Sequence, residues 1–520
     1  MAPESGPKEQ GDQSPGLPVP EEIICVLKKE SGYEVVSLQQ QQGDKDTKPE
    51  FKLSLSSYDH VGNGSTVASI EQHLLDDYLV HGLPEHIQPG PRRRVHVLVS
   101  THSGTGLGMQ FYSTVLAPLF QRLDLRPHEG VTTEEGAHFS QGGGSYNLVV
   151  TQDADSVKNF AQGIASGQSD TGGRPIEHTV VLLSGDGGIV DMLNCIASTE
   201  EGGGGGGGKD ISDSKSGSSS IPLLALLPLG TGNALFNSLH KAASAKAPAV
   251  SDLVHGLRTL LLGKAAPLPS FKAVFPEGSR TITYSKGPEP ASASSTDASA
   301  TLEEHADSVT HLYGVVVASY GFHSQLVWES DTPAYRKHGA ARFQMVAQEL
   351  LKESHAYDAT VEMVATSSST ATDTDNTTAA TGRRGRDRHA YVLATLVSNL
   401  EKTFCISPDS RPLDSQLRLV HFFGPTDGAK TMEIMMAAYD GGKHVGLRWS
   451  LDQDGEGERE EAVGYEQIDE LRITTHEEDK RWRKVCIDGT IVEIPRDGCM
   501  VVRREARHHL RVLVDTSIAS

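Results

Sequence analysis

The fold of this chain is decided by VVLLSGDGG at residues 180–188, where a short apolar run leads straight into a glycine-rich turn. A second run leads in the same way into GTGN at residues 230–233. Each stretch predicts a strand, a tight turn and a helix, whose backbone N–H groups suit a phosphate. The first turn also carries a carboxylate, Asp186. Because a carboxylate repels bare phosphate, Asp186 indicates a metal ion or a hydroxyl whose proton it can take. The pair of turns therefore points to phosphoryl transfer.

The sequence around the two turns alternates between strands and helices. Strands are predicted at 95–99, 148–151, 180–183 and 223–227, and helices at 109–123, 157–164, 189–196 and 233–240. In the helices 157–164 and 189–196, apolar residues recur at spacings of 0, 3, 4 and 7, which is the period of an amphipathic helix. Strands that alternate with helices predict a parallel sheet with ligand loops at the carboxyl ends of the strands.

Beyond about residue 271 the pattern changes to short alternating segments. They lie at 315–318, 391–397, 417–422, 485–487, 491–494, 500–502 and 510–514, with one helical patch at about 340–352. Such segments favour an antiparallel β-sandwich or an open barrel. The sequence thus predicts two domains, an α/β domain at 91–265 and a β-sandwich domain at 266–520.

Polar, glycine-rich or serine-rich stretches interrupt these domains. They are expected to be disordered insertions at 200–220, 288–307 and 367–388, and residues 1–20 are expected to form a disordered tail. Residues 21–90 contain strand-like pieces and predict a small accessory segment.

Composition excludes several classes of function. The 520 residues carry a formal net charge of −21, which argues against a nucleic-acid partner. Two basic clusters, at 92–94 and 383–388, could touch phospholipid headgroups or simply be solvated. The five scattered cysteines are typical of free thiols in a reducing compartment. With no signal peptide and no apolar run long enough to span a bilayer, we expect a cytoplasmic protein that associates peripherally with membranes.

Four segments, taken in order, resemble the lipid kinase family that contains diacylglycerol, ceramide and sphingosine kinases. They are VLVSTHSG at 97–104, SGDGGIVDMLN at 184–194, PLGTGN at 228–233 and DGT at 488–490. A fifth, SYGF at 319–322 with the stretch up to Phe343, is most similar to sphingosine kinases. The resemblance implies a nucleotide-binding domain like that of NAD kinases and phosphofructokinases, followed by a lipid-binding domain.

The resemblance also implies roles for individual residues. Asp186 is expected to be the catalytic base, although it could instead cap the helix that follows it. Asp191 is placed with the substrate or with a water-bound metal, and Val327 stands where sphingosine kinases hold the head of the lipid with an aspartate. No direct protein cluster for a metal is expected. The residues expected to bind nucleotide are Ser100, Ser103, Gly104, Thr151, Gly185, Gly187, Gly230, Thr231, Gly232, Asn233, Arg336, Arg342, Asp488 and Gly489.

Arg336 and Arg342 match two arginines near the phosphates in the family, and a guanidinium can hold phosphate through two hydrogen bonds. Asp488-Gly489 is also a standard signal for a two-residue hairpin that needs no ligand. Three further departures from the family are Ser100-Thr101 for Asn-Pro, Gly188 for Thr and Thr490 for Glu.

The sequence therefore predicts an enzyme that uses ATP and Mg²⁺ to phosphorylate the primary hydroxyl of a sphingoid base at a membrane surface. The alternatives are a kinase for diacylglycerol or ceramide, an NAD kinase, and a relative that binds nucleotide or lipid without catalysis. A homodimer is compatible with the sequence.

Overall fold

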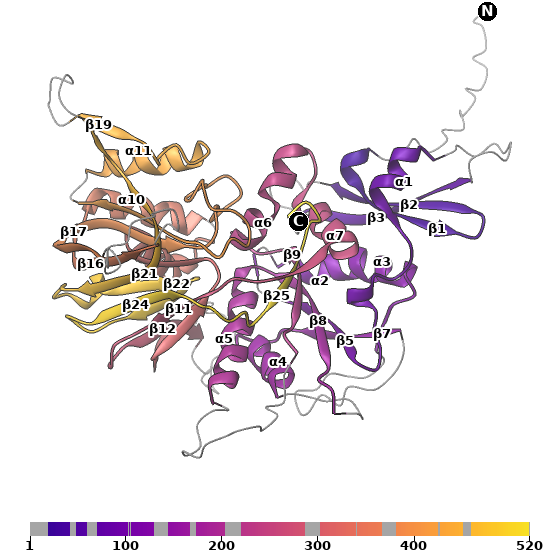
Figure 1. Ribbon diagram of the computed structural model, residues 1–520, viewed down its shortest axis with the longest axis horizontal. Helices are drawn as coiled ribbons and strands as arrows, with labels where there is room; N and C mark the ends of the chain where they lie inside the picture. Colours follow the sequence, from indigo (N-terminus) through magenta and orange to yellow (C-terminus); the bar gives the residue numbers. More distant parts are fainter. Residues whose placement is uncertain are drawn as a thin grey trace, which may run out of the picture.

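A computed structural model of the chain shows an α/β part, a β-rich part and a small N-terminal sheet (Figure 1). The described residues are 19–41, 48–59, 70–101, 103–104, 106–128, 144–166, 173–202, 220–286, 302–339, 341–366, 381–424, 427–450 and 459–518. Most of the predicted disordered tail and much of the three predicted insertions lie outside these residues.

A seven-stranded sheet forms the centre of the α/β part, in the order β10-β25-β9-β8-β5-β7-β6. Its strands are β5 (Arg93–Val99), β6 (Arg126–Pro127), β7 (Ser145–Val150), β8 (Glu177–Ser184), β9 (Leu223–Pro228), β10 (Lys264–Pro267) and β25 (Arg511–Val514). All neighbouring pairs are parallel except β10 with β25. The predicted parallel sheet is confirmed, and its carboxyl ends gather the loops that follow β5, β8 and β9.

Helices cover both faces of this sheet. They are α2 (Gly108–Phe111), the π-helical turn η3 (Tyr112–Leu116), α3 (Ala117–Arg122), α4 (Ser156–Ala165), α5 (Asp186–Gly202), α6 (Ala234–Lys246) and α7 (Asp252–Leu262). The apolar faces of α4, α5 and α6 belong to one core, and those of α3 and α7 to another. In α4, Val157, Ala161 and Ile164 are buried as their spacing predicts.

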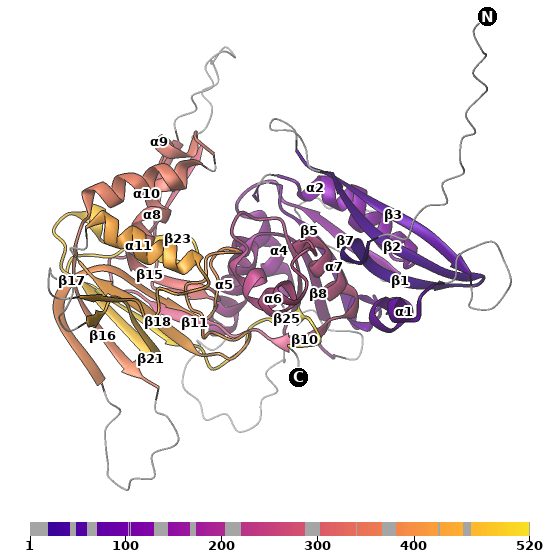
Figure 2. The same cartoon turned by 90° about the horizontal axis from the view of Figure 1, so that it is seen from above.

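The N-terminal segment forms a four-stranded sheet in the order β3-β2-β1-β4. Its elements are η1 (Pro20–Glu22), β1 (Ile23–Lys29), β2 (Gly32–Gln41), β3 (Glu50–Asp59), α1 (Gln72–Tyr78), β4 (Leu79–Val80) and η2 (Glu85–Ile87). Ile24, Val36 and Phe51 share a core with α3 and α7, so this sheet packs on the α/β part (Figure 2).

The β-rich part is one twelve-stranded antiparallel sheet. Its strands β14 and β15 follow one another in sequence but are far apart in the strand order, so the sheet must curl to bring them close together. Its strands are β11 (Phe271–Val274), β12 (Arg280–Lys286), β13 (Leu302–Ser308), β14 (His311–Gly314), β15 (Val317–Gly321), β16 (Tyr357–Ala365), β17 (Thr381–Thr395), β18 (Leu417–Phe423), β21 (Gly464–Thr475), β22 (Lys484–Ile487), β23 (Thr490–Glu493) and β24 (Cys499–Arg504). A separate hairpin pairs β19 (Arg448–Ser450) with β20 (Arg459–Glu461).

Helices also pack against this second sheet, as Figure 2 shows for α8, α10 and α11. The elements are α8 (Phe322–Asp331), α9 (Pro333–Arg336), α10 (Ala341–Glu353), α11 (Gly428–Tyr439) and η4 (Lys480–Trp482). Only α10 coincides with a predicted helix. No helix within the described ranges is both long and apolar enough to cross a membrane.

The structure corrects several predicted boundaries. The segment 510–514 was expected in the β-sandwich, but β25 pairs with β9 in the parallel sheet and brings the end of the chain back to the α/β part. Three predicted insertions overlap ordered elements: α5 runs to Gly202, β13 pairs with β12, and β17 pairs with β16 from Thr381 onward. Cross-strand pairing accounts for the two strands, and such partners are not visible in local composition.

Asn194 on α5 joins the two parts of the chain. Its side-chain amide donates to the carbonyl of Tyr313 at 2.8 Å and accepts from the N–H of Tyr313 at 2.8 Å. The apolar core of α4, α5 and α6 continues through Tyr313, Val315 and Val317 into the β-rich part. A paired amide and a shared core therefore fix α5 to β14.

We expect Asn194→Ala to lower the midpoint of thermal unfolding clearly. The substitution leaves the N–H and the carbonyl of Tyr313 without partners, and each costs about 1–3 kcal/mol when buried. Differential scanning calorimetry measures the change, with Asn159→Ala on the exposed side of α4 as the control. Equal midpoints for the two variants would contradict this role of Asn194.

Candidate active site

The two glycine turns lie in direct backbone contact. A Cβ atom built on Gly230 would fall 2.3 Å from the Cα of Gly185, and one built on Gly104 would fall 2.4 Å from the carbonyl oxygen of Leu229. At distances this short, a side chain at either position would force the backbone of the two turns apart. The loops after β5, β8 and β9 therefore converge at one edge of the sheet.

Asp186 faces the second turn. Its carboxylate accepts hydrogen bonds from the N–H of Ala234 at 2.7 Å and of Leu235 at 3.1 Å, the first two residues of α6. Asp186 is thus a helix cap, but of α6 and not of the helix that it begins. Burial raises the pKa of the Asp186 carboxyl, and the two N–H donors act against this shift.

The capping changes the expected phosphate site. The N–H groups at the start of α6 were predicted to be open to a phosphate, but the first two hold the carboxylate of Asp186. Thr231, in the turn itself, is exposed, while Gly232 and Asn233 are half-buried. A phosphate at this edge would meet the turn and not the end of α6.

Asn233 fixes the shape of the second turn. It has a left-handed backbone with φ of 51°. Its side-chain oxygen accepts from the N–H of Gly230 and its side-chain nitrogen donates to the carbonyl of Gly230, both at 3.0 Å. Asn237 also donates to the carbonyl of Gly232 at 2.8 Å. Asn233 therefore supports the turn through its side chain.

Hydroxyl groups line the loop that follows β5. The Oγ of Ser103 lies 2.7 Å from that of Ser100 and 3.1 Å from that of Ser184. A Cβ on Gly188 would fall 2.9 Å from the Oγ of Ser184, so the small residue at 188 leaves room for this serine. Thr151 accepts from the N–H of Thr101 at 3.1 Å and so joins the end of β7 to the same loop.

A small hollow opens between the turns. Its lining includes Ser184, Gly185 and Asp186 from the first turn, and Asn233 and Phe236 from the second turn and α6. Gly187 is exposed beside it, with no atom within 4 Å of a Cβ built there. The rest of the lining, Leu182, Ile189, Leu226 and Pro228, is apolar, so the hollow combines polar groups of the two turns with side chains of the core.

Asp488 lies in the two-residue turn between β22 and β23, where it and Gly489 have φ of 48° and 90°. Its carboxylate accepts from three consecutive N–H groups, those of Val315 at 2.6 Å, Val316 at 3.1 Å and Val317 at 2.5 Å. Burial raises the pKa of Asp488 to about 7, with a small contribution from the charge of Asp186 and against the effect of the three N–H donors. Asp488 therefore anchors the segment from β14 to β15 on the side of Asp186.

We expect Asp488 to make the protein less stable as the pH rises from about 4 to about 7. Over this window the unfolded chain releases the proton while the folded protein retains it, so the free energy of unfolding falls. Urea unfolding at pH 5 and pH 7.5 measures the effect.

Asp488→Asn should show a smaller difference between the two pH values. It is also expected to be less stable at both, because an amide has one acceptor oxygen for three N–H groups. An undiminished pH difference in the variant would show that another group titrates.

Four predicted site residues lie elsewhere. The Nη2 of Arg336 contacts Asp331 at 2.7 Å, and its Nη1 donates to the carbonyl of Tyr284 at 2.9 Å. Arg342 lies over the ring of Phe343. Asp191 lies near Lys158 of α4, and burial raises its pKa. Val327 packs against the apolar cluster of Ile282, Cys486 and Ile491. No contact in the described structure brings these four side chains to Asp186.

Sequence reasoning missed the residues that join the site to the β-rich part. Ser238 on α6 exchanges hydrogen bonds with the backbone of Asn399, at 3.0 Å and 3.2 Å. A Cβ on Gly232 would fall 3.3 Å from the carbonyl oxygen of Leu400. Isolated asparagine and serine residues carry no signal of this kind, because their partners lie more than 100 residues away in sequence.

Carboxylates of the site suit Mg²⁺ only in part. Mg²⁺ usually binds one or two carboxylates together with phosphates of the substrate, and Asp186 offers one carboxylate with lone pairs beyond its two N–H bonds. Among the residues whose placement is described, no group of three or more His, Cys, Asp or Glu side chains could hold a metal ion. A Mg²⁺ ion would thus need ligands from a bound nucleotide.

One family model matches a range of the chain that contains the two glycine turns. Residues 94–265 match the family model of the diacylglycerol kinase catalytic domain. Two solved structures similar to this chain are a diacylglycerol kinase from Bacillus anthracis str. Sterne, at 11% identity and a TM-score of 0.40, and a provisionally assigned diacylglycerol kinase from the same strain, at 12% and 0.45. Each comparison covers 82% of this chain and 98% of the other. No curated protein sequence matches the chain.

Proposed function

We propose that this chain, whose residues 94–265 match the family model of the diacylglycerol kinase catalytic domain, is an ATP-dependent lipid kinase that phosphorylates a primary hydroxyl. The observation that carries the proposal is the contact between the two glycine turns, with the carboxylate of Asp186 between them. The turns would hold the phosphates of ATP, and Asp186 would meet the acceptor alcohol.

The reaction follows from this arrangement. The hydroxyl oxygen of the lipid attacks the γ-phosphorus of ATP, the bond from that phosphorus to the bridging oxygen of ADP breaks, and the hydroxyl proton passes to Asp186. The Ser100, Ser103 and Ser184 hydroxyls and the turn at 230–233 position the phosphates. Mg²⁺ bound with ATP supplies charge neutralisation. Positioning and electrostatic stabilisation provide most of the rate in phosphoryl transfer.

The acceptor in this proposal is a sphingoid base, on the resemblance of the segment 319–343 to sphingosine kinases. A neutral lipid alcohol, diacylglycerol or ceramide, is a second candidate, favoured by the surroundings of Val327. This side chain lies in an apolar cluster, and the nearby carboxylates of Glu329 and Asp331 are bound to Arg481 and Arg336. The two carboxylates closest to Val327 in sequence are thus already paired with arginines.

Transfer of γ-labelled phosphate from ATP to a panel of lipids tests the proposal, with the products separated by chromatography. The panel contains sphingosine, diacylglycerol and ceramide, with NAD as a soluble acceptor. Label on sphingosine supports the first candidate and label on diacylglycerol or ceramide the second. Label on NAD alone, or binding of ATP without transfer, would overturn the proposal.

A further inference from the structure

Three large apolar side chains project from one side of α11 into solvent. Met432, Met436 and Tyr439 are 42%, 58% and 43% exposed, and they lie at spacings of 0, 4 and 7. The opposite side of α11, with Thr431, Ile434 and Ala438, is buried against the β-rich part. We call Met432, Met436 and Tyr439 the α11 stripe. Part of the outer side of α11 is therefore apolar although it faces solvent.

The stripe is too small for a stable contact between two copies of the chain. About half of each side chain is exposed, which gives roughly 300 Å² from side chains of about 200 Å² each. A stable protein interface buries about 800 Å² on each partner. A patch of about 300 Å² suits insertion into the boundary of a lipid layer, where a few apolar side chains suffice.

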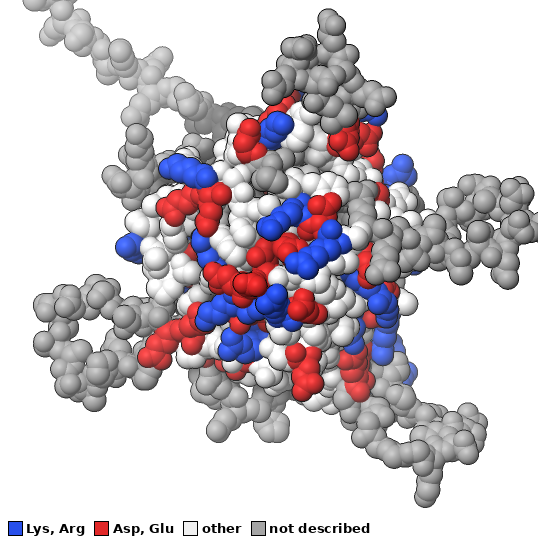
Figure 3. Space-filling model, turned by 90° about the vertical axis from the view of Figure 1, so that its left-hand side faces the viewer, with Lys and Arg blue, Asp and Glu red and all other residues white. Residues whose placement is uncertain are grey.

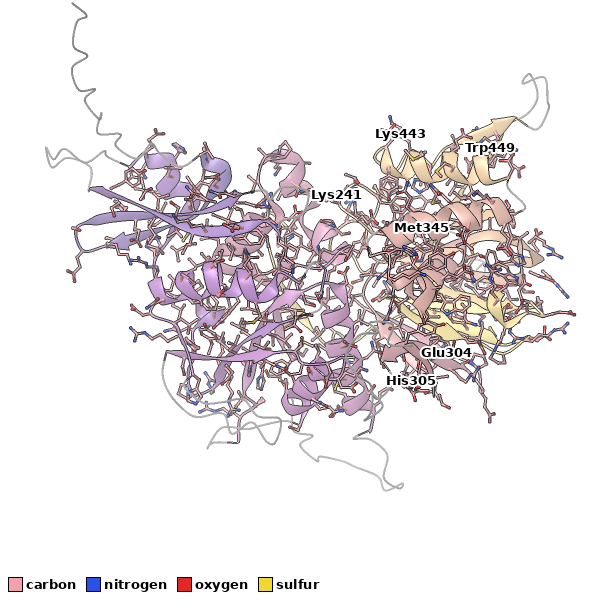
Figure 4. All side chains as sticks on the ribbon, turned by 180° about the vertical axis from the view of Figure 1, so that it is seen from behind. Lys241, Glu304, His305, Met345, Lys443 and Trp449 are labelled. Carbon is pink, nitrogen blue, oxygen red and sulfur yellow. The ribbon has the colours of Figure 1, made fainter. Side chains whose placement is uncertain are left out.

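Side chains beside the stripe are typical of a membrane–water boundary. Trp449 donates its indole N–H to Glu433 at 3.3 Å, and the ammonium of Lys430 lies over its ring. Lys443 pairs with Asp440 at 2.6 Å. Figure 4 shows Lys443 and Trp449 at the outer edge of the β-rich part. The carboxylates of Glu433 and Asp440 offset the two lysines, so these four side chains carry no net charge together.

The wider surface that Figure 3 shows on the β-rich part also lacks a large patch of only acidic or only basic side chains. Figure 3 shows acidic and basic side chains intermingled over this end of the molecule. With a formal net charge of −21, the whole chain would be repelled by an anionic layer. Contact through the stripe would therefore depend on apolar insertion, with little contribution from charge.

Contacts through the loop 400–404 link the stripe to the candidate active site. The ring of Tyr439 packs edge-on against Phe404 with centroids 4.8 Å apart, and its hydroxyl lies 3.3 Å from a carboxylate oxygen of Glu401. These two residues belong to the loop that carries Leu400, whose carbonyl borders Gly232 of the second turn. The loop 400–404 thus connects the stripe to the turn proposed to bind ATP.

We propose that the α11 stripe docks the protein on an uncharged, zwitterionic lipid bilayer by inserting Met432, Met436 and Tyr439 at the interface. The inference rests on the proposed function, because an enzyme that phosphorylates a lipid must reach its substrate in a bilayer. Docking through this stripe places the loop 400–404, and with it the second turn, on the membrane side of the protein.

Flotation with phosphatidylcholine vesicles tests the inference, at 0.1 M and 0.5 M NaCl. The full chain is expected to bind equally at both salt concentrations, and Met432→Ser with Met436→Ser should weaken binding about tenfold to a hundredfold. The control, Ile221→Ser with Val274→Ser, replaces two apolar residues that are 38% and 43% exposed elsewhere. The control is expected to bind like the unmodified chain.

Three results would overturn the inference: undiminished binding by the α11 variant, binding lost at high salt, or a dimer in size-exclusion chromatography that the α11 variant breaks. Phosphate transfer to short-chain lipids dissolved below their micelle concentration separates this failure from that of the proposed function. Transfer without vesicle binding sinks only the docking surface. Vesicle binding without transfer sinks the kinase and leaves the docking surface.

Discussion

Asp186→Asn is expected to lower kcat for phosphate transfer about 10²–10⁴-fold, because an amide cannot take the proton of the acceptor hydroxyl. The variant keeps one acceptor oxygen for the N–H of Ala234 but turns an NH₂ group toward the N–H of Leu235. We therefore expect a lower midpoint of thermal unfolding as well. Steady-state kinetics and calorimetry on the same preparation separate the chemical effect from the structural one.

Asp191→Asn provides the matched control. Asp191 lies on the same helix, and burial raises its pKa as it does for Asp186, but its charged neighbours are Lys158 and Asp155 of the α4 region. We expect kcat within about threefold of the unmodified chain, since this side chain does not face the turns. Equal losses in both variants would show that carboxylates of α5 act through stability and not through proton transfer.

Local sequence predicted four strands of the α/β part, β5, β7, β8 and β9, and the helices that follow them, because each of these contains its own signal, whereas α7, β6 and β10 were not predicted. The buried strands read as apolar runs, and α4 buries the residues that its period requires. The contact between Gly185 and Gly230 agrees with the predicted parallel sheet, since both glycines follow the carboxyl ends of parallel strands. Neighbouring parallel strands bring such turns to one edge, and this geometry is general.

The β-rich part was predicted less well because its order depends on partners that are distant in sequence. The apolar residues of α8 do not gather clearly on one side of the helix. Its polar residues Ser324, Gln325 and Glu329 are buried instead. Strand β13 has an acidic sequence that does not predict a strand, and it is stabilised by antiparallel pairing with β12. The basic residues of β17 are likewise strand residues, with Arg386 paired to Asp358 at 2.8 Å.

For the candidate site, sequence patterns identified the loops but not the partners of the charged groups. Asp186 was expected to be the catalytic base or to cap its own helix, and the structure shows that it caps α6 from a turn 48 residues earlier in the chain. Arg336 was expected at the phosphates, but Asp331 lies five residues before it and meets it with two oxygens. A carboxylate at that spacing satisfies the guanidinium locally, and a motif comparison does not weigh this competition.

Gly230→Ala is expected to have the second largest effect, a loss of ATP affinity of about tenfold to a hundredfold. Its Cβ would lie 2.3 Å from the Cα of Gly185 and 2.7 Å from the side-chain oxygen of Asn233. The two turns would have to separate, and overpacking of this kind costs about 1–3 kcal/mol. Isothermal titration calorimetry with ATP measures the affinity.

Gly163→Ala separates the turn from a general effect of adding a methyl group. Gly163 lies in α4, where no atom is within 4 Å of a built Cβ, so alanine should leave ATP affinity unchanged and stabilise the helix by about 0.5–1 kcal/mol. The same methyl group is thus favourable on α4 and harmful at the turn. If Gly230→Ala binds ATP as the unmodified chain does, the contact between the turns serves folding alone, and nucleotide must bind elsewhere.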